Sequence, residues 1–239
     1  RHSSKKIYTA SKIPPKNFKW PAKPHYTLED SYPASHILEY TNRTLKNLGL
    51  EQIDLMQFHT WDDGWAHCEE WQRTVEELKT SGKIAAMGIS VNRWEPENGI
   101  LALKTGFIDA VQVIYNIFDQ APEDLLFPLC EKMDIGVIAR VPFDEGTLTG
   151  TITKETTFPE GDWRGTYFVP ENLIASVDKA DALRPIIPQE MTMAEMALRF
   201  ITMNNVVSSI IPGMRKERNV LSNTSTSDGK GLSEKLFKE

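Results

Sequence analysis

Residues 53–63, IDLMQFHTWDD, decide the fold of this chain. The segment is a short apolar run that follows a Gly-Leu turn and ends in His59, a tryptophan and two aspartates. Its length and its flanks indicate a buried strand, and a strand buried on both faces is typical of a parallel sheet with helices outside it. His59 then lies at the carboxyl end of the strand, where α/β enzymes place their chemistry. The competing interpretation is a core histidine that bonds a backbone carbonyl.

Apolar runs alternate with amphipathic helices along the rest of the chain. Strands are predicted at residues 6–12, 53–59, 83–90, 109–116, 136–141 and 206–211. Helices are predicted at residues 35–48, 69–81, 96–105, 122–133, 170–183, 192–203 and 216–223. Ser35 is predicted to cap the first helix, and Thr192 with Glu195 forms a capping box for another. Residues 16–33 are rich in proline and aromatics, which predicts a long surface loop.

Repeating βα units indicate a parallel sheet that is either open or closed into a barrel. The chain has neither the G-x-G-x-x-G nor the P-loop fingerprint of open nucleotide-binding sheets, which favours a TIM (β/α)8 barrel. Such a barrel has eight strands, and about six of the eight βα units are predicted here. We therefore expect residues 1–239 to form a single barrel domain that lacks the first two βα units. A C-terminal tail is expected at residues 225–239, polar and mobile at 225–230.

Composition excludes several classes of function. The 239 residues are 40% hydrophobic and 25% charged, which is ordinary for a soluble globular protein. A formal net charge of −6 argues against nucleic acid or anionic membranes as partners. No apolar run approaches the roughly 20 residues that span a bilayer. Cys68 and Cys130 lie in predicted helices, which indicates reduced thiols and a cytoplasmic location. The oligomeric state is open.

Polar side chains stand at the carboxyl end of nearly every predicted strand. They are Lys12, His59, Ser90 with Asn92, Gln112 with Asn116, Arg140, and Gly213 with Arg215. Strand ends of a βα barrel meet at one mouth, and buried polar groups cost free energy unless they are satisfied, so the set indicates a site. The spacing of His67, Cys68 and Glu69 does not suit a metal ion, and no Gly-x-Ser-x-Gly elbow is present. A lysine, a histidine and amides suit a polar cofactor and the polarisation of a carbonyl.

Three aromatic residues are predicted to project from the same mouth, namely Trp61, Trp65 and Phe118. They would form an apolar wall for a hydrophobic or aromatic carbonyl substrate. Core packing is the competing interpretation.

Six segments together resemble the aldo-keto reductase superfamily. They are TASK at 9–12, IDLMQFH at 53–59, GISVN at 88–92, VQVIYN at 111–116, GVIARVPFDEGTLTG at 136–150 and IIPGMRKERNVLSN at 210–223. They cover almost the whole chain, in order and at plausible spacings. The resemblance implies a (β/α)8 barrel that binds an extended nicotinamide cofactor, usually NADPH with NADH as the alternative. It also implies hydride transfer between the nicotinamide and a small-molecule aldehyde or ketone.

Members of this superfamily use an aspartate, a tyrosine, a lysine and a histidine in catalysis. Lys12 matches the lysine and His59 the histidine. An ammonium favours the phenolate and so lowers the pKa of the tyrosine, and the histidine orients the carbonyl and helps to deliver the proton. The aspartate and tyrosine are expected upstream of this chain, because Tyr8 lies about 13 Å deeper along the predicted strand. The competing interpretation of Lys12 is an exposed lysine before a Pro-Pro turn.

The resemblance also implies a set of cofactor-binding residues. Ser90, Asn92 and Gln112 match the carboxamide-binding residues, although the inserted Val91 disturbs the register of Asn92. Arg140 stands where many members have a tyrosine that stacks on the nicotinamide, and Phe143 and Gly146 follow in the same segment. The adenosine phosphate is matched by Gly213, Arg215 and Asn223, and pairing of Arg215 with a 2′-phosphate favours NADPH. Residues 161–168 either fold over the cofactor or form an ordinary surface loop.

Two other functions compete with a reductase. The first is a regulatory subunit on the same barrel that senses nicotinamide and turns over slowly, as do some relatives associated with ion channels. The second is a phosphate-binding barrel with isomerase or lyase chemistry, which would have no affinity for NADPH.

Overall fold

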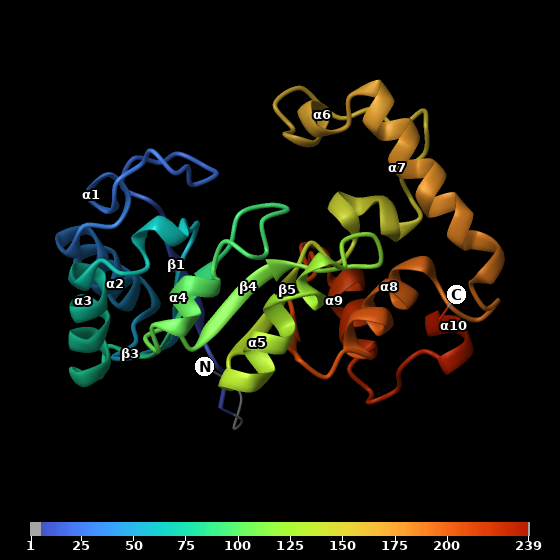
Figure 1. The fold of residues 1–239 in the computed structure, drawn as a ribbon. Helices are drawn as coiled ribbons and strands as arrows, with labels where there is room; N and C mark the ends of the chain where they lie inside the picture. Colours follow the sequence, from blue (N-terminus) through green and yellow to red (C-terminus); the bar gives the residue numbers. More distant parts are fainter. Residues whose placement is uncertain (1–5, 239) are drawn as a thin grey trace. The chain divides into compact units, whose positions relative to one another are not determined.

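The strands form one sheet in chain order. The computed structural model describes residues 6–238. Within this range the sheet has the order β1-β2-β3-β4-β5-β6, so all six predicted strands are present (Figure 1). The strands are β1 (Ala10–Ile13), β2 (Ile53–Phe58), β3 (Ile84–Ser90), β4 (Ala110–Ile114), β5 (Gly136–Arg140) and β6 (Val207–Ile210). The pairs from β1 to β4 are parallel, as the helical crossovers between them require.

Helices follow the strands as the sequence predicts. They are α1 (Leu28–Ser31), α2 (Ala34–Leu48), α3 (Glu69–Thr80), α4 (Ile100–Lys104), α5 (Leu126–Met133), α6 (Arg164–Tyr167), α7 (Pro170–Leu183), α8 (Met193–Thr202), α9 (Glu217–Ser225) and α10 (Glu234–Lys238). Short 3₁₀ helices are η1 (Asp63–Trp65), η2 (Ala121–Glu123), η3 (Asp144–Thr149) and η4 (Arg184–Ile186). None of the helices in this part of the chain has the length and apolar character that crossing a bilayer requires.

The chain divides into two compact units. Unit 1 holds the described residues up to Val113 together with Ala121–Ile138, and unit 2 holds Ile114–Gln120 and the described residues from Ala139 onward. The predicted domain also takes in residues 1–5 and 239, which lie outside the described range. A single barrel domain that lacks two βα units stays a prediction.

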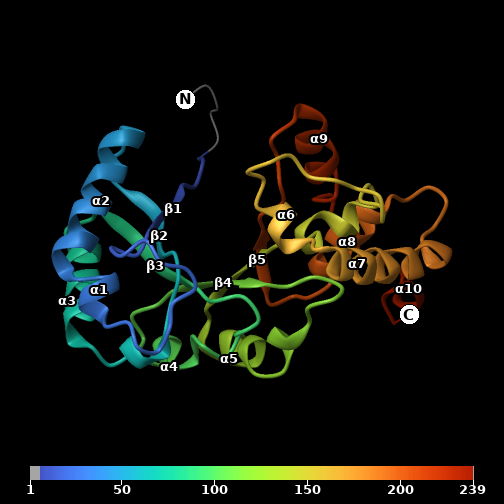
Figure 2. The ribbon, with the colours of Figure 1, turned by 90° about the horizontal axis from the view of Figure 1, so that it is seen from above.

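In unit 1, one face of the sheet is apolar and covered by helices. Met56 and Phe58 of β2, with Met87 of β3, are fully buried on this face. Figure 2 shows α2 and α3 side by side along it. Trp71 of α3 meets the ring of Phe58 edge-on at 6.1 Å between centroids. Edge-to-face aromatic pairs add to the stabilisation that burial alone provides, so this cluster anchors α3 on the strands.

Two expectations for residues 16–48 are wrong in detail. Pro33, not Ser35, is the N-cap of α2, because proline at this position already has extended backbone angles and Ser35 lies within the first turn. The expected surface loop contains α1, which starts at a capping box. Thr27 Oγ1 accepts from the backbone N–H of Asp30 at 3.1 Å, and the Asp30 carboxylate accepts from the N–H of Thr27 at 2.9 Å. These reciprocal bonds satisfy N–H groups that a short helix otherwise leaves open.

In unit 2, α8 organises the packing. The hydroxyl of Thr192 accepts from the N–H of Glu195 at 3.1 Å, which confirms the predicted start of the helix. Arg199 of α8 donates to Asp228 at 2.9 Å, and Phe237 of α10 stacks on Phe200 at 5.4 Å. An ion pair at Asp228 and an aromatic contact at Phe237 join the tail to α8, and the mobility expected at residues 225–230 stays a prediction.

Trp71→Ala tests the aromatic cluster of unit 1. Trp71 is completely buried, so its loss leaves a cavity and costs about 3–5 kcal/mol of unfolding free energy. Trp94→Ala is the matched control, because Trp94 is 66% exposed and its removal changes stability by less than about 0.5 kcal/mol. Denaturant titration of both variants measures the difference. Equal stability of the two variants would show that the cluster does not support the fold.

Candidate active site

The pairing register of β1 to β4 aligns the predicted strand-end residues. Lys12 pairs with Gln57, and Gln57 pairs with Gly88. Ser90 lies two residues beyond Gly88 on β3, and it pairs with Gln112 of β4. Paired residues point to the same side of a sheet, and residues two apart on one strand share a face. The side chains of this row therefore lie on the face opposite the helices, and they are those of Lys12, Gln57, Ser90 and Gln112.

His59 continues this row. Its backbone N–H donates to the carbonyl of Ile13 at 3.0 Å, which extends the ladder between β1 and β2 by one residue. His59 is two residues beyond Gln57, so it shares a face with Gln57 and Lys12 at the carboxyl ends of neighbouring strands. Lys12 is half-buried and His59 is exposed, which excludes the core-histidine interpretation.

Little space remains around Gly88, which lies in this row closer to the amino ends of the strands than His59. A methyl group on Gly88 would come within 2.9 Å of the carbonyl oxygen of Ala110 and 3.0 Å of Cγ of Gln57. Gln57 is 2% exposed, and its Oε1 has no hydrogen-bond partner. Glycine at 88 is thus the residue that leaves room for a buried amide beside Lys12, which sequence reasoning did not find.

Tyr32 fixes the end of β2. Its hydroxyl accepts from the backbone N–H of Thr60 at 3.1 Å and donates to the carbonyl of the same residue at 3.0 Å. Burial raises the pKa of the Tyr32 phenol far above its usual value. This tyrosine therefore holds the residue after His59 in place and keeps its proton.

Asn92 makes structural hydrogen bonds, and its predicted contact with the carboxamide stays a prediction. Its Oδ1 accepts from the N–H of Ala22 at 3.1 Å and from Thr60 Oγ1 at 2.7 Å. Its Nδ2 donates to the carbonyl of Ala22 at 3.0 Å and to Glu95 at 2.9 Å. These four bonds engage both the oxygen and the nitrogen of the amide within unit 1. Asn92 therefore ties the loop after β1 to the ends of β2 and β3, and the expected carboxamide contact has no support from its geometry.

The predicted aromatic wall is only partly as expected. Trp61 and Trp65 are 0% and 4% exposed, and their rings meet at 5.6 Å inside the aromatic cluster of unit 1. Phe118 lies in unit 2, half-buried against Leu148 and its neighbours. The structure favours the core-packing interpretation for Trp61 and Trp65, because other aromatic side chains surround them, whereas Phe118 is only half-buried and has Lys179 over its ring. A different aromatic residue, Trp20, meets the His59 ring edge-on at 5.6 Å.

Unit 2 holds Arg140, which was predicted to stack on the nicotinamide, and the two residues predicted with it, Phe143 and Gly146. Arg140 is half-buried at the end of β5, and its carbonyl accepts from the N–H of Tyr115 at 3.3 Å. Phe143 packs against the cluster of Leu148, and Gly146 has a φ of 117°, which only glycine adopts readily. Packing in the core therefore accounts for Phe143, and the backbone conformation accounts for glycine at position 146.

The loop after β6 and the helix that follows it are joined. Nδ2 of Asn223 donates to the carbonyl of Gly213 at 3.3 Å, and Arg215 between them is exposed. The structure therefore brings Gly213 and Asn223 together, as the sequence suggested. The Arg215 guanidinium also acts on Asp162, whose pKa is lowered to about 2, mainly by hydrogen bonds from Arg164 and to a smaller extent by the charge of Arg215.

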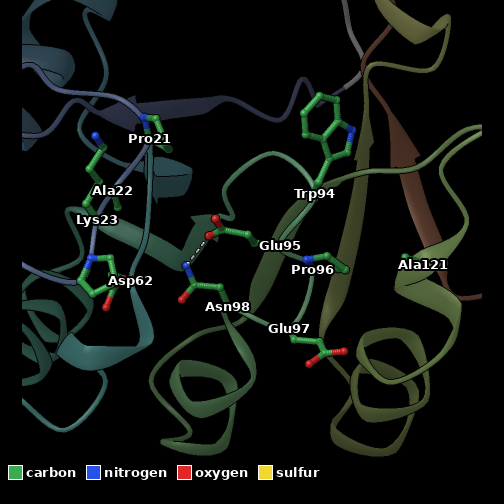
Figure 3. Close-up of a pocket in the computed structure, with 11 residues that line it drawn as sticks. Pro21, Ala22, Lys23, Asp62, Trp94, Glu95, Pro96, Glu97, Asn98 and Ala121 are labelled. Atoms are coloured by element: carbon green, nitrogen blue, oxygen red, sulfur yellow. Dashed lines mark hydrogen bonds between the residues drawn. The ribbon is translucent and has the colours of Figure 1, made fainter.

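A pocket in unit 1 is distinct from this row. Figure 3 shows a pocket of about 710 Å³ between the loop at Pro21–Pro24 and the loop that carries Trp94, Glu95 and Asn98. Neither Lys12 nor His59 lines it. Asn98 Nδ2 donates to Glu95 at 3.0 Å across its floor. The pocket is a structural consequence of the loops that Asn92 joins, and the candidate reaction centre lies elsewhere.

Comparison with known proteins identifies the family. The model of the aldo/keto reductase family matches residues 1–239, and the chain belongs to this family. An NADH-specific methylglyoxal reductase from Escherichia coli (strain K12) is 29% identical over 191 residues, which cover 78% of this chain and 58% of that relative. An uncharacterized oxidoreductase, YqkF, from Bacillus subtilis (strain 168) is 27% identical over 206 residues, or 85% of this chain and 64% of the relative. The chain thus spans about three fifths of these curated relatives.

A solved structure confirms the predicted fold class. The holo form of an aldo-keto reductase from Bacillus halodurans superposes with a TM-score of 0.73 and 25% identity, covering 97% of this chain and 71% of that chain. The parallel sheet of six strands within residues 6–238 corresponds to part of such a βα barrel. The resemblance suggested by the six segments is confirmed.

The loop at residues 158–168 is predicted to respond to acid. Arg164 donates to Asp162 from Nε at 3.0 Å and from Nη2 at 2.6 Å. Because the pKa of Asp162 is lowered from 3.8 to about 2, these bonds stabilise the loop fully above the higher value. Their contribution is lost as the pH falls through the lower value.

Hydrogen exchange of this loop measures the effect against Asp162→Asn. At about pH 6 the loop of the wild type should exchange more slowly than that of the variant, and at about pH 2 the two should exchange alike. Comparing the two proteins at each pH cancels the intrinsic pH dependence of exchange. A wild type that exchanges like the variant at both pH values would contradict the prediction.

Proposed function

We propose that this chain takes part in hydride transfer between a nicotinamide cofactor and an aldehyde or ketone. The observation that carries the proposal is the placement of Lys12 and His59 on one face of β1 and β2, at their carboxyl ends. Family membership supports the same chemistry, since the E. coli relative is a methylglyoxal reductase by name.

The residues of the row suit the cofactor and the carbonyl. Bound beside them, a nicotinamide supplies the hydride. Ser90 and Gln112 are buried, paired polar residues that can bond a carboxamide. The ammonium of Lys12 favours a phenolate and so prepares a tyrosine to give up its proton. The imidazole of His59 donates to the carbonyl oxygen and holds it for reduction. The resemblance implies a tyrosine and an aspartate as the other two members of the catalytic set.

Turnover tests this proposal directly. The chain has only the lysine and histidine of the catalytic set and is expected to be inactive alone. A protein that supplies the tyrosine and aspartate together with this chain should reduce methylglyoxal or an aryl aldehyde with NADPH or NADH, which is measured as loss of cofactor absorbance. Lys12→Met and His59→Asn should each lower kcat by about 10²-fold or more, because each removes a group that moves or orients a proton. Cofactor affinity should stay within about twofold, since neither side chain is proposed to bind the adenosine end. Wild-type rates in both variants would overturn the assignment.

The choice of cofactor depends on Arg215. Its exposed guanidinium follows Gly213 in the loop that Asn223 holds, and a guanidinium binds phosphate through two parallel hydrogen bonds. We propose that it pairs with the 2′-phosphate and that NADPH is preferred, although the E. coli relative is NADH-specific by name. Residues 161–168 would then fold over the bound cofactor.

Arg215→Ala should weaken the binding of NADPH about tenfold and the binding of NADH less than about twofold, because only NADPH carries the 2′-phosphate. Quenching of tryptophan fluorescence by each cofactor measures the two dissociation constants. Arg43→Ala, which removes an equal charge from α2 in unit 1, is the matched control and should change neither constant. Equal weakening of both cofactors by Arg215→Ala would contradict a 2′-phosphate contact.

A cofactor sensor is the second candidate. Tyr32 does not supply the proton donor of a reductase, because its buried phenol is engaged with Thr60. NADPH binding without turnover, in a protein that supplies the tyrosine and aspartate together with this chain, would select the sensor. Absence of NADPH binding would reject both candidates and favour a phosphate-binding barrel.

The proposed location is the cytoplasm. Burial raises the pKa of the Cys130 thiol to about 12, so this thiol stays protonated and unreactive. That chemistry agrees with the reduced state predicted from the sequence.

A further inference from the structure

The pocket of unit 1 carries an excess of negative charge. Three carboxylates and one ammonium group line it, and they belong to Asp62, Glu95, Glu97 and Lys23. The rest of the lining is mostly apolar and consists chiefly of prolines, alanines and the indole of Trp94. Its volume of about 710 Å³ is typical of a site for a small molecule. The lining therefore suits a compact cation that also has an apolar part.

Two of these carboxylates are held in place by hydrogen bonds. Asp62 is 8% exposed, and its Oδ1 accepts from the backbone N–H of Gly64 at 2.9 Å. Glu95 Oε2 accepts from Nδ2 of Asn92 at 2.9 Å and from Nδ2 of Asn98 at 3.0 Å (Figure 3). Within the described residues, the second carboxylate oxygen of Asp62 and that of Glu95 have no hydrogen-bond partner. A buried carboxylate needs such a partner, so the Asp62 oxygen in particular is an acceptor that a ligand can satisfy.

The indole of Trp94 forms one side of the pocket, across from Pro21 in Figure 3. Trp94 is 66% exposed, and the guanidinium of Arg93 lies 5.3 Å from the centre of its ring. The φ of Trp94 is 60°, in the left-handed region that a bulky residue adopts only where the surrounding structure holds it. The face of an aromatic ring attracts cations, as the contact with Arg93 illustrates. An exposed indole beside fixed carboxylates is therefore a combination that recognises an organic ammonium ion.

We propose that this pocket binds a small aliphatic amine in its ammonium form. The N–H groups of the ammonium donate to the open carboxylate oxygens of Asp62 and Glu95, and the alkyl part packs against Trp94 and the prolines. The site is separate from the candidate reaction centre, because neither Lys12 nor His59 lines it. The inference therefore does not depend on the proposed function.

Binding of pentylammonium and of n-pentanol to the full chain tests the proposal. Both dissociation constants are measured by ligand-observed NMR titration at about pH 7, where an alkylamine is fully protonated and the alcohol is its neutral counterpart. Pentylammonium should bind at least about tenfold more tightly than n-pentanol, because only the cation pairs with the carboxylates. Asp62→Asn and Trp94→Ala should each weaken the binding of pentylammonium about fivefold.

Matched variants outside the pocket are the controls. Glu76→Gln removes one exposed negative charge from α3, and Trp163→Ala removes an indole of unit 2 that is 52% exposed. Neither should change the affinity for pentylammonium. Asp62→Asn keeps the size of the side chain and an acceptor for the N–H of Gly64. Trp94→Ala alters an exposed side chain, so it keeps the test decisive if Asp62→Asn fails to fold.

Several outcomes overturn the proposal. They are equal affinity for pentylammonium and n-pentanol, unchanged affinity for pentylammonium in a folded Asp62→Asn or Trp94→Ala variant, and an equal loss of affinity in Glu76→Gln. The last outcome would show that the net charge alone attracts the cation. A glycine-lysine-glycine peptide with blocked ends presents the same ammonium on a protein side chain. If it binds more than about tenfold more tightly than pentylammonium, the small-amine ligand is refuted and the pocket recognises a lysine of another protein.

Discussion

The parallel register of β1, β2 and β3 is the constraint on which the rest of unit 1 depends. It fixes which residues lie level with one another, and so it places Lys12, Gln57 and Gly88 in one row. A slip of one residue would turn every side chain of a strand to the opposite face. Lys12 or His59 would then point into the apolar layer under α2 and α3, where a charged group is costly. Burial of the hydrophobic face therefore fixes the register, and the register fixes which residues of the polar face lie level with one another.

The sequence predicted the elements well where a single physical cause decided them. The apolar run of β2 had to be buried, and Gly49 adopts the left-handed conformation that ends α2. The residues of α7, Pro170–Leu183, were predicted to the residue, because proline at the first helical position marks the start. The placement of Lys12 and His59 on one face was predictable, because residues that close neighbouring parallel strands share one edge of a sheet.

What the sequence did not reveal depends on contacts between distant loops. Asn92 follows a strand end, as a cofactor-binding residue would, yet its amide is bonded to Ala22, 70 residues earlier in the chain. Trp61 and Trp65 follow β2 closely, but only the docking of α3 shows that they face inward. Trp20 lay in a segment that was noted for its aromatics, and no local pattern indicates that it meets His59. The periodicity of a sequence predicts which face of a helix or strand a residue occupies. It does not predict which distant loop packs against that face.

The bonds that hold the loop after β1 are made by the main chain of Ala22, with Thr60 and Asn92 as the fixed partners. At Ala22 the course of that loop therefore depends on the main chain and not on the side chain. Substitutions near Ala22 can leave these bonds to the strand ends intact. One scaffold can then acquire new ligand preferences through single substitutions in the loop, without a matching change in its core.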